Sequence, residues 1–352
     1  MTIESFIKIK NSKFFKNKYL LSDEDKDFIA ESRKQICSIL FEKKPFESKL
    51  LIVAGPCSIH DENSALEYAE KILEMQKKIG DHFLLVMRFY FEKPRTRTGW
   101  KGLLYDPQLD GSCDLETGID VTRRLMYEIT RMRVPLASEM VDPICLHYFN
   151  DLISWLCIGA RTSSSQAHRQ MVSGQTVPVG FKNDLSGSIG NAVNSLIASS
   201  NGHTYLAIDD EGEVGVCKSR GANHSHIVLR GAQGQPNYQA EMIKEFMNEL
   251  DKQGLTRCIM IDCSHENCGK KHENISTVFR NVVEQVENGN DWIRGLMIES
   301  HLLPGSQLLS DGTLPDPKIS ITDPCIGWAE TEELIHWADK LLFAQLIRKR
   351  KK

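Results

Sequence analysis

Two sets of side chains combine suitable chemistry with a shared position, because each member lies at or just beyond the end of a short apolar run. The first set is cationic: Arg88, Lys93, Arg95, Arg161, Lys182 and Arg230. Buried cations without partners are costly, and guanidinium forks match phosphate oxygens. Six cations gathered at one edge therefore predict a phosphorylated ligand. Any one of them taken alone is equally well explained as a solvated surface charge.

The second set consists of residue types that ligate metals: Cys57, His265, Glu299 and Asp323. A thiolate, an imidazole and two carboxylates suit Mn²⁺, Fe²⁺, Co²⁺, Zn²⁺ or Cu²⁺. Each also has an ordinary structural interpretation, since Cys57 can be a small buried residue and Asp323 can cap the helix that follows it. The four lie far apart in the sequence, so spacing alone does not establish a metal site.

The apolar runs must bring both sets to one place. Strand-like runs cover residues 50–57, 84–91, 135–140, 157–161, 178–182, 226–231, 258–265 and 295–300. Helical patterns cover residues 62–79, 115–131, 144–155, 164–173, 187–199, 238–253, 272–288 and 330–348. Eight strands, each followed by a helix, predict an α/β protein with a (β/α)₈ TIM barrel, whose active site lies at the carboxyl ends of its strands.

Two segments depart from this alternation. Residues 1–48 are expected to form an extension with one helix over residues 22–42, capped by Ser22, before a single barrel over residues 49–348. Residues 204–219 predict a β-hairpin around a Glu-Gly turn, inserted before the sixth barrel strand. In the alternative arrangement, residues 204–208 lie in the barrel and residues 226–231 outside it. The first is preferred because the 226–231 run ends in an arginine beside a glycine.

Composition narrows the class of protein. The 352 residues include 43 Lys and Arg against 47 Asp and Glu, a net charge of −4, which argues against binding to duplex nucleic acid despite the basic end at residues 348–352. No apolar run reaches the length of a membrane span, and no convincing signal peptide is present. Ten scattered cysteines without a CxxC pair predict free thiols in a reducing cytoplasm.

Longer strings point to a family. AGPCSIHD, MRFYFEKPRTRTGWKGL, IGAR, PVGFKN, LRG, MIDCSH, MIESHL and SITDPCIGW occur in this order between residues 49 and 345. They resemble type I 3-deoxy-D-arabino-heptulosonate-7-phosphate (DAHP) synthases, the feedback-regulated microbial enzymes that open the shikimate pathway. That resemblance implies a metal-dependent condensation of phosphoenolpyruvate with erythrose 4-phosphate and water, which gives DAHP and phosphate.

The resemblance also assigns roles to residues. It implies that Cys57, His265, Glu299 and Asp323 hold one divalent metal, and that Arg88, Lys93, Arg161, Lys182 and Arg230 bind phosphoenolpyruvate. Arg95 and Thr96 match the erythrose 4-phosphate site. Lys93 is a candidate proton donor to the developing alkoxide. His265, Glu139 and a hydroxide on the metal are candidate acceptors for the proton of the attacking water.

Family members are inhibited by an aromatic amino acid and assemble as homodimers or homotetramers, so the resemblance implies both here. The implied effector positions are Met140, Val141, Leu146, His147, Met171, Gln175, Thr176, Tyr205 and Ala207, with a lean toward the tryptophan-sensitive branch. Two other functions stay open from the residues alone. One is a class I aldolase that uses Lys182 as a Schiff base. The other is a non-catalytic barrel that only binds an effector.

Overall fold

The computed structural model describes residues 3–42, 49–79, 82–95, 97–309 and 315–350, with side chains described as far as residue 342. Its main sheet closes into a barrel of eight parallel strands in the order β1-β2-β3-β4-β5-β8-β9-β10, because β10 pairs back onto β1. The strands are β1 (Leu50–Gly55), β2 (Phe83–Arg88), β3 (Leu136–Glu139), β4 (Trp155–Ile158), β5 (Val179–Lys182), β8 (Ser225–Leu229), β9 (Ile259–Asp262) and β10 (Ile293–His301), and the short β11 (Ile326–Gly327) pairs in parallel with the end of β10. The predicted TIM barrel is confirmed.

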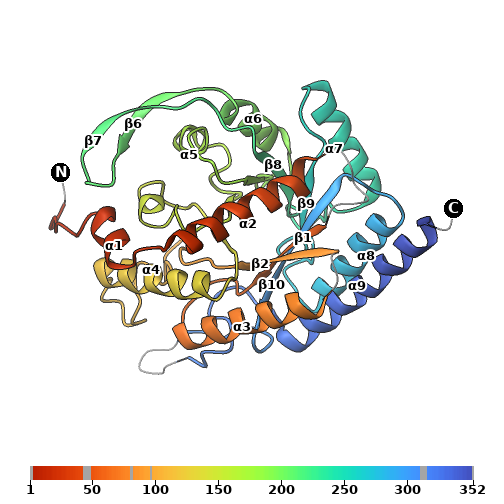
Figure 1. Ribbon diagram of the computed structural model, residues 1–352, viewed down its shortest axis with the longest axis horizontal. Helices are drawn as coiled ribbons and strands as arrows, with labels where there is room; N and C mark the ends of the chain where they lie inside the picture. The colour runs from red at the N-terminus through yellow and green to blue at the C-terminus, as the bar shows by residue number, and fades with distance from the viewer. Residues whose placement is uncertain (1–2, 43–48, 80–81, 96, 310–314, 351–352) are drawn as a thin grey trace.

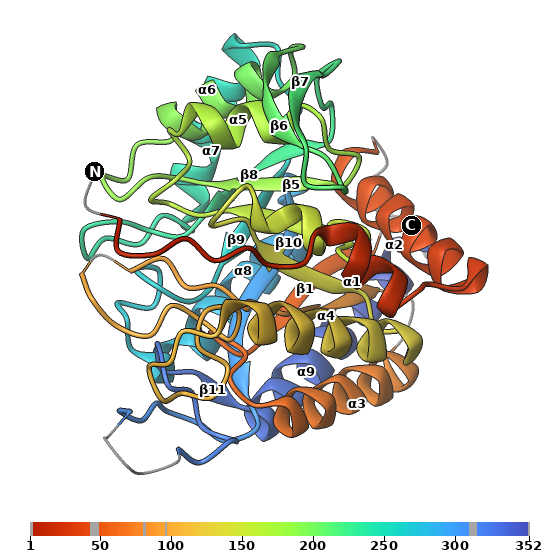
Figure 2. The ribbon, with the colours of Figure 1, turned by 90° about the vertical axis from the view of Figure 1, so that its left-hand side faces the viewer.

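Helices surround this barrel, and Figure 2 shows α3 and α4 side by side along its outside. They are α3 (Glu62–Lys78), α4 (Leu115–Arg131), α5 (Gln166–Val172), α6 (Gly190–Ser199), α7 (Ala240–Lys252), α8 (Ile275–Glu287) and α9 (Trp328–Arg350). Their apolar stripes pack on the outer face of the strands and form the larger hydrophobic cluster. Both faces of the parallel sheet are therefore buried, which explains the nearly continuous apolar runs in its strands.

A second, smaller cluster fills the barrel interior, with Val53, Val86, Trp155 and Met260 among its members. It also includes Ile36, Ile39 and Leu40 of α2 (Asp23–Phe41), so the extension helix packs against the interior side chains. A capping box between Ser22 and Asp25 begins that helix. The opposite end of the barrel, where the strands reach their carboxyl termini, holds the polar side chains.

The inserted hairpin is confirmed as the antiparallel pair β6 (Thr204–Ile208) and β7 (Val214–Lys218), which precedes the sixth barrel strand, β8. It extends away from the barrel toward α1 (Ser12–Lys18), a helix that the sequence pattern did not predict (Figure 1). The backbone N–H of Lys13 donates to Asp210 O over 3.0 Å, and Lys16 pairs with Asp210 over 2.8 Å. The N-terminal extension is thus attached to the barrel through α2 and to the hairpin through α1.

One predicted helix is wrong. Residues 144–155 form a 3₁₀ helix, η1 (Cys145–Tyr148), followed by turns. The backbone N–H of Phe149 donates to Leu146 O over 3.0 Å, and that of Leu152 donates to Phe149 O over 2.9 Å. These bonds span three residues, and Leu146, Phe149 and Leu152 are all buried. Apolar residues spaced three apart lie on one face of an α-helix, but they lie on one face of successive 3₁₀ turns as well. The sequence pattern therefore does not distinguish the two structures.

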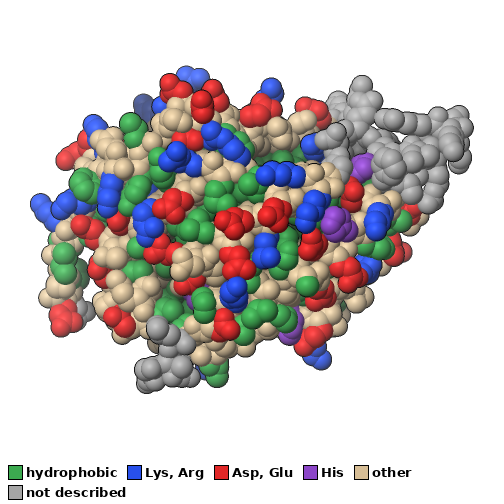
Figure 3. All heavy atoms as spheres, turned by 60° about the horizontal axis from the view of Figure 1, so that its bottom comes forward, with side chains coloured by type: hydrophobic (Ala, Val, Ile, Leu, Met, Phe, Trp, Pro, Cys, Tyr) green, Lys and Arg blue, Asp and Glu red, His purple; other side chains and the backbone are tan. Residues whose placement is uncertain are grey.

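None of the described helices is long and apolar enough to cross a membrane. On the face shown in Figure 3, blue and red side chains lie interleaved among hydrophobic ones. Charges on this face therefore alternate in sign rather than gathering into one patch.

Candidate active site

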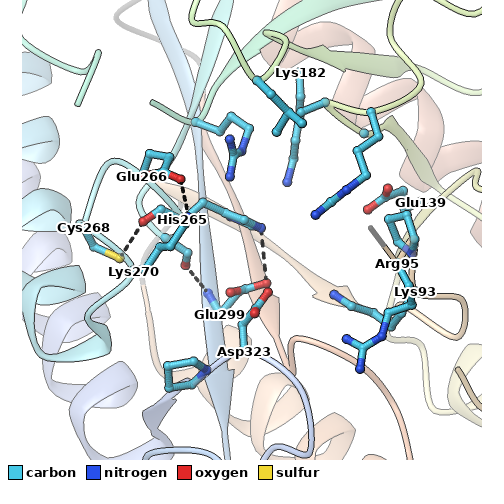
Figure 4. Close-up of a pocket in the computed structure, with 18 of the residues that line it drawn as sticks. Lys93, Arg95, Glu139, Lys182, His265, Glu266, Cys268, Lys270, Glu299 and Asp323 are labelled. Atoms are coloured by element: carbon cyan, nitrogen blue, oxygen red, sulfur yellow. Dashed lines mark hydrogen bonds and ion pairs between the residues drawn. The ribbon is translucent and has the colours of Figure 1, made fainter. Parts of the chain in front are cut away.

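A cavity of about 530 Å³ lies at the carboxyl ends of the barrel strands. Figure 4 shows Lys93 and Lys182 reaching into the same space that His265, Glu299 and Asp323 face. The described cations that line it are Arg88, Lys93, Arg95, Arg97, Arg161, Lys182, Arg230 and Lys270. The described carboxylates are Glu139, Glu266, Glu299 and Asp323. Eight cations against four carboxylates leave an excess of four positive charges (8 − 4), as expected of a site for phosphorylated ligands.

Three of the four expected metal-binding residues come together at this cavity, which Glu299 and Asp323 line and beside which Cys57 is fully buried. One ligand atom from each of Cys57, Glu299 and Asp323 lies within 4.8 Å of the others. His265 lies beside the group, with its Nε2 3.8 Å from Glu299 Oε1. Strands β1 and β10 pair in register at Gly55 and Glu299, which explains how residues so distant in sequence meet. A thiol with two carboxylates fits a divalent metal of borderline softness.

Cys57 lies in a polar but buried setting. Lys93 Nζ lies 3.0 Å from Cys57 Sγ, and Asp323 Oδ2 lies 3.5 Å from it. Burial, with a smaller contribution from Glu299, raises the pKa of Cys57 to about 12. Burial acts to lower the pKa of Lys93, but the neighbouring Cys57 and Glu299 outweigh it and raise that pKa. Lys93 therefore stays protonated in the free protein, as a proton donor must be.

Two of the expected anion-binding cations already have carboxylate partners. Arg88 Nη2 lies 2.8 Å from Glu299 Oε1, and Lys182 Nζ lies 2.8 Å from Asp262 Oδ2. For these two residues the protein itself supplies a counter-charge, so they are not the unpaired buried cations from which a phosphorylated ligand was predicted. The Lys182 pair also disfavours the Schiff-base alternative, because the amine is bonded to a buried carboxylate and is not free to attack a carbonyl carbon.

Arg230 contrasts with them. Its side chain is buried, and the only hydrogen bond that it donates within the described structure runs to Gly231 O over 3.5 Å. No described carboxylate forms an ion pair with it, although Glu266 is close enough for Arg230 to contribute to lowering the Glu266 pKa. Burial raises that pKa, but the bonds from Lys270 and from the Gly234 N–H outweigh it. Unlike Arg88 and Lys182, Arg230 is therefore buried without a carboxylate ion-pair partner among the described residues.

The two protein side chains named as proton acceptors lie on opposite sides of the cavity in Figure 4. Glu139, at the end of β3, packs against Gly159, where an added Cβ would lie 2.2 Å from Glu139 Oε1. A side chain at position 159 would therefore have to displace the Glu139 carboxylate from its place. His265 adopts a left-handed backbone conformation, with φ of 57°, just beyond β9. Its Nδ1 lies 2.9 Å from Asp262 Oδ2, outside hydrogen-bond alignment.

The expected effector positions lie away from this cavity, where the loop after β3, α5 and the hairpin approach one another. His168 of α5 bonds the carbonyl of Val141 over 3.0 Å, and a Cβ on Gly174 would lie 3.1 Å from the hydroxyl of Tyr205. Burial, followed by the charge of Lys16, lowers the pKa of His147. Met140, Leu146 and Met171 are buried nearby, whereas Thr176 is exposed.

Sequence reasoning missed three Arg, Lys or Glu residues that line the cavity, and one predicted residue lies outside the described structure. Thr96 is that residue. Arg97, Glu266 and Lys270 line the cavity without having been expected. Arg97 continues the KPRTRT string, which offered a signal for it. Glu266 and Lys270 form a 2.8 Å ion pair within one loop, which no run of apolar residues marks.

Comparison with known proteins gives consistent matches. A model of the DAHP synthetase I family matches residues 43–336. A phospho-2-dehydro-3-deoxyheptonate aldolase of Salmonella typhimurium, described as Tyr-sensitive, is 43% identical over 320 residues, covering 90% of this chain and 88% of that protein. A Trp-sensitive protein of that name from Enterobacter agglomerans is 41% identical over 312 residues, covering 88% of each. A Phe-sensitive one from Escherichia coli K12 is 40% identical over 318 residues, covering 90% of each. The solved structure of phospho-2-dehydro-3-deoxyheptonate aldolase from Francisella tularensis superposes with a TM-score of 0.93 at 34% identity, over 98% of this chain and 99% of that one.

Proposed function

Because this chain belongs to the DAHP synthetase I family and condenses phosphoenolpyruvate with erythrose 4-phosphate to give DAHP and phosphate, we propose that the cavity described above holds both substrates. The observation that carries this assignment is the excess of eight cations over four carboxylates, next to a Cys-Glu-Asp group of metal-ligand type. Two phosphorylated substrates bring the negative charge that this excess lacks.

Cys57, Glu299 and Asp323 would hold one divalent metal, with His265 as the fourth ligand. The donors fit Mn²⁺, Fe²⁺, Co²⁺, Zn²⁺ or Cu²⁺. When bound, the metal supplies Lewis acidity toward the aldehyde oxygen of erythrose 4-phosphate. Arg88 bonds Glu299 over 2.8 Å and so orients one of these ligands.

The cations would hold phosphoenolpyruvate by its carboxylate and phosphate. Arg161, Lys182 and Arg230 line one part of the cavity, and Lys93 and Arg95 reach in from the loop after β2. The methylene carbon of phosphoenolpyruvate then attacks the aldehyde carbon, water adds at C2, and phosphate leaves with cleavage of its C–O bond. Much of the rate would come from this fixed orientation and from preorganised charge.

Three groups would move protons in this sequence. Lys93 is protonated and would donate to the alkoxide that forms from the aldehyde oxygen. Glu139 and His265 both line the cavity and are the two protein candidates for accepting the proton of the attacking water, His265 only in place of its role as a metal ligand. Arg95 would hold the phosphate of erythrose 4-phosphate, and Thr96, which lies outside the described residues, is the second residue that the resemblance implies for this role.

An aromatic amino acid would act as feedback inhibitor near Val141, Met171 and Tyr205, and the strings NCGKKH and ITDPC favour tryptophan. We also propose that residues 1–48 are a regulatory and contact segment on a single catalytic barrel, and that the chain forms homodimers or homotetramers. Exposed apolar residues support such contacts: Phe6, Ile7, Leu206 and Val216 have between 67% and 85% of their surface accessible.

The test measures phosphate released from phosphoenolpyruvate and erythrose 4-phosphate. Chelation is expected to abolish release, and each of the candidate metals is then restored separately. The same assay with phenylalanine, tyrosine and tryptophan identifies the effector. Release that is unaffected by thorough chelation would contradict the metal site, and inhibition by tyrosine or phenylalanine alone would contradict the preference for tryptophan.

A further inference from the structure

The backbone polar groups of Arg230 and Gly231 are buried but lie outside the hydrogen-bond ladder of the barrel sheet. Strand β8 ends at Leu229, so the next two residues leave the barrel ladder, yet both are buried. Their two N–H groups and two carbonyls all need hydrogen-bond partners there, because an unpaired buried backbone group is costly.

Asparagine residues bond all four of these groups. Asn183 Oδ1 accepts from the N–H of Arg230 over 2.9 Å, and Asn183 Nδ2 donates to Gly231 O over 3.1 Å. Asn237 Oδ1 accepts from the N–H of Gly231 over 2.8 Å. The backbone N–H of Asn267 donates to Arg230 O over 3.3 Å.

The three asparagines also bond one another. Asn237 Nδ2 donates to Asn183 Oδ1 over 3.2 Å, and the backbone N–H of Asn237 donates to Asn267 Oδ1 over 2.8 Å. All three side chains are buried, and each comes from the segment beyond a different strand. The network therefore ties the ends of β5, β8 and β9 together around Arg230.

Steric packing fixes the same point. Gly231 has a φ of 70°, and a Cβ there would lie 2.8 Å from the backbone N of Asn267. Only glycine allows the loop that carries Asn267 to approach this closely. That loop begins at His265, and the N–H of Lys270 donates to His265 O over 2.7 Å. The close contact at Gly231 therefore also helps to place His265, an expected metal ligand.

The Arg230 side chain depends on this arrangement more than its neighbours do. Lys182 is oriented by Asp262 and Arg88 by Glu299, through side-chain ion pairs of 2.8 Å. Arg230 has no such pair among the described residues, so its backbone determines where its guanidinium points.

We propose that Asn183, Asn237 and Asn267 are positioning residues that hold Arg230 ready for the phosphate of phosphoenolpyruvate. This inference rests on the proposed function, in which Arg230 binds that phosphate. None of the three side chains needs to touch the substrate, since each would act through the backbone of Arg230 and Gly231.

The test variant is Asn237→Leu, which keeps the branched shape and the number of side-chain heavy atoms but removes both the acceptor for Gly231 and the donor to Asn183. We expect the KM for phosphoenolpyruvate to rise about tenfold, because small displacements of a positioning group are expensive in catalysis. The KM for erythrose 4-phosphate should stay within about twofold, since Arg95 lies on a different loop. A general loss of folded protein would not distinguish the two substrates. Asn237→Asp keeps the acceptor for Gly231 and should show a smaller rise.

The matched control is Gln76→Leu. Gln76 also uses its side-chain amide to bond a barrel strand, donating to Phe83 O over 3.3 Å and accepting from the N–H of Leu85 over 2.8 Å. These bonds lie at the amino-terminal end of β2, away from the cavity at the carboxyl ends of the strands. Gln76→Leu should leave both KM values unchanged. Equal KM increases for the two substrates in Asn237→Leu would overturn the inference, as would an unchanged KM for phosphoenolpyruvate.

A double variant separates this inference from the function on which it rests. Arg230→Lys should raise the KM for phosphoenolpyruvate, and adding Asn237→Leu should then raise it by less than about threefold more, because the residue through which it acts is already impaired. If Arg230→Lys leaves that KM unchanged, the role of Arg230 in the proposed function fails. If Arg230→Lys raises it and the two changes multiply in full, the positioning role fails while the proposed function stands.

Discussion

The cavity and the contact between α1 and the hairpin both consist largely of charged side chains, yet the charges are arranged in opposite ways. At the hairpin each lysine faces a carboxylate, as in the Lys13–Glu211 and Lys16–Asp210 pairs, and these side chains are partly or largely exposed. In the cavity the described cations outnumber the carboxylates, and Arg88, Lys182 and Arg230 are buried.

This difference indicates that the charges of the cavity, unlike those at the hairpin, are arranged to bind a charged ligand. Exposed pairs that neutralise each other are solvated with or without their partner, so each contributes little. A buried excess of one sign is held in place by the rest of the fold against desolvation and repulsion, and it becomes favourable when an anion binds. Changes in the cavity should therefore affect function strongly, and changes at the hairpin should affect it weakly.

The largest effect is expected from Cys57→Ser. A serine hydroxyl is a poor substitute for a thiolate, so metal affinity and phosphate release should each fall by at least about a hundredfold. Cys258→Ser is the control, since Cys258 is equally buried but, unlike Cys57, belongs to no group of potential metal ligands among the described residues. Equilibrium dialysis measures bound metal, and a Cys57→Ser protein with unchanged metal content and rate would show that Cys57 is not a ligand.

Lys93→Met comes next. It removes the proposed proton donor while keeping the length of the chain, so kcat should fall by roughly 10²- to 10⁴-fold. Lys101→Met provides a control from the same loop, because Lys101 is exposed and accepts the backbone bond from Lys93 over 2.8 Å. A Lys93→Met protein that retains full kcat would exclude the proton-donor role.

Glu92→Gln should affect stability rather than chemistry, and it tests the opposite case of a buried carboxylate without a cation among the described residues. Burial, with the charge of Asp142, raises the pKa of Glu92 to about 8. The folded state therefore binds this proton more tightly than the unfolded state, and the wild-type protein loses stability as the pH rises from about 4 to about 8. Glutamine does not titrate, so the variant should be more stable than wild type above pH 8, by up to about 5 kcal/mol.

Chemical denaturation at about pH 5 and about pH 9 measures this effect, and the difference between variant and wild type should shrink at the lower pH. Glu273→Gln is the control because the Glu273 side chain is 70% exposed. A stability difference that is the same at both pH values would show that Glu92 is not protonated in the folded protein.

The sequence predicted the barrel because its strands are buried on both faces. Each strand therefore appears in the sequence as a short, nearly continuous apolar run, which the segments between the strands lack. It also placed Arg88, Lys182 and Glu299 correctly at strand ends, since a barrel brings all of these ends to one rim. The 144–155 helix was wrong because apolar residues at intervals of three fit both an α-helix and successive 3₁₀ turns.

Cross-barrel pairings were beyond the reach of sequence. The Arg88–Glu299 and Lys182–Asp262 pairs depend on which side chains face each other across the interior, and strand order alone does not determine that. The asparagine network around Arg230 was likewise invisible, because Asn183, Asn237 and Asn267 lie in three separate segments that only the closed barrel brings together.

The smallest effect is expected at the hairpin, from Lys16→Met. The Lys16 and Asp210 side chains are 19% and 44% exposed, so their pair should contribute less than about 1 kcal/mol to the free energy of unfolding. Burial opposes ionisation of Asp210, but the bonds from Lys16 and Ser12 outweigh it and lower the Asp210 pKa. The contribution should therefore be present above about pH 4 and disappear as the pH falls through the lowered pKa.

A double-mutant cycle with Asp210→Asn measures the pair directly, and kcat should not change in any member of the cycle. A coupling energy well above about 1 kcal/mol, or a loss of kcat comparable with that of Lys93→Met, would show that substitutions at the hairpin contact affect the protein as strongly as those in the cavity. The contrast between the two regions would then not hold.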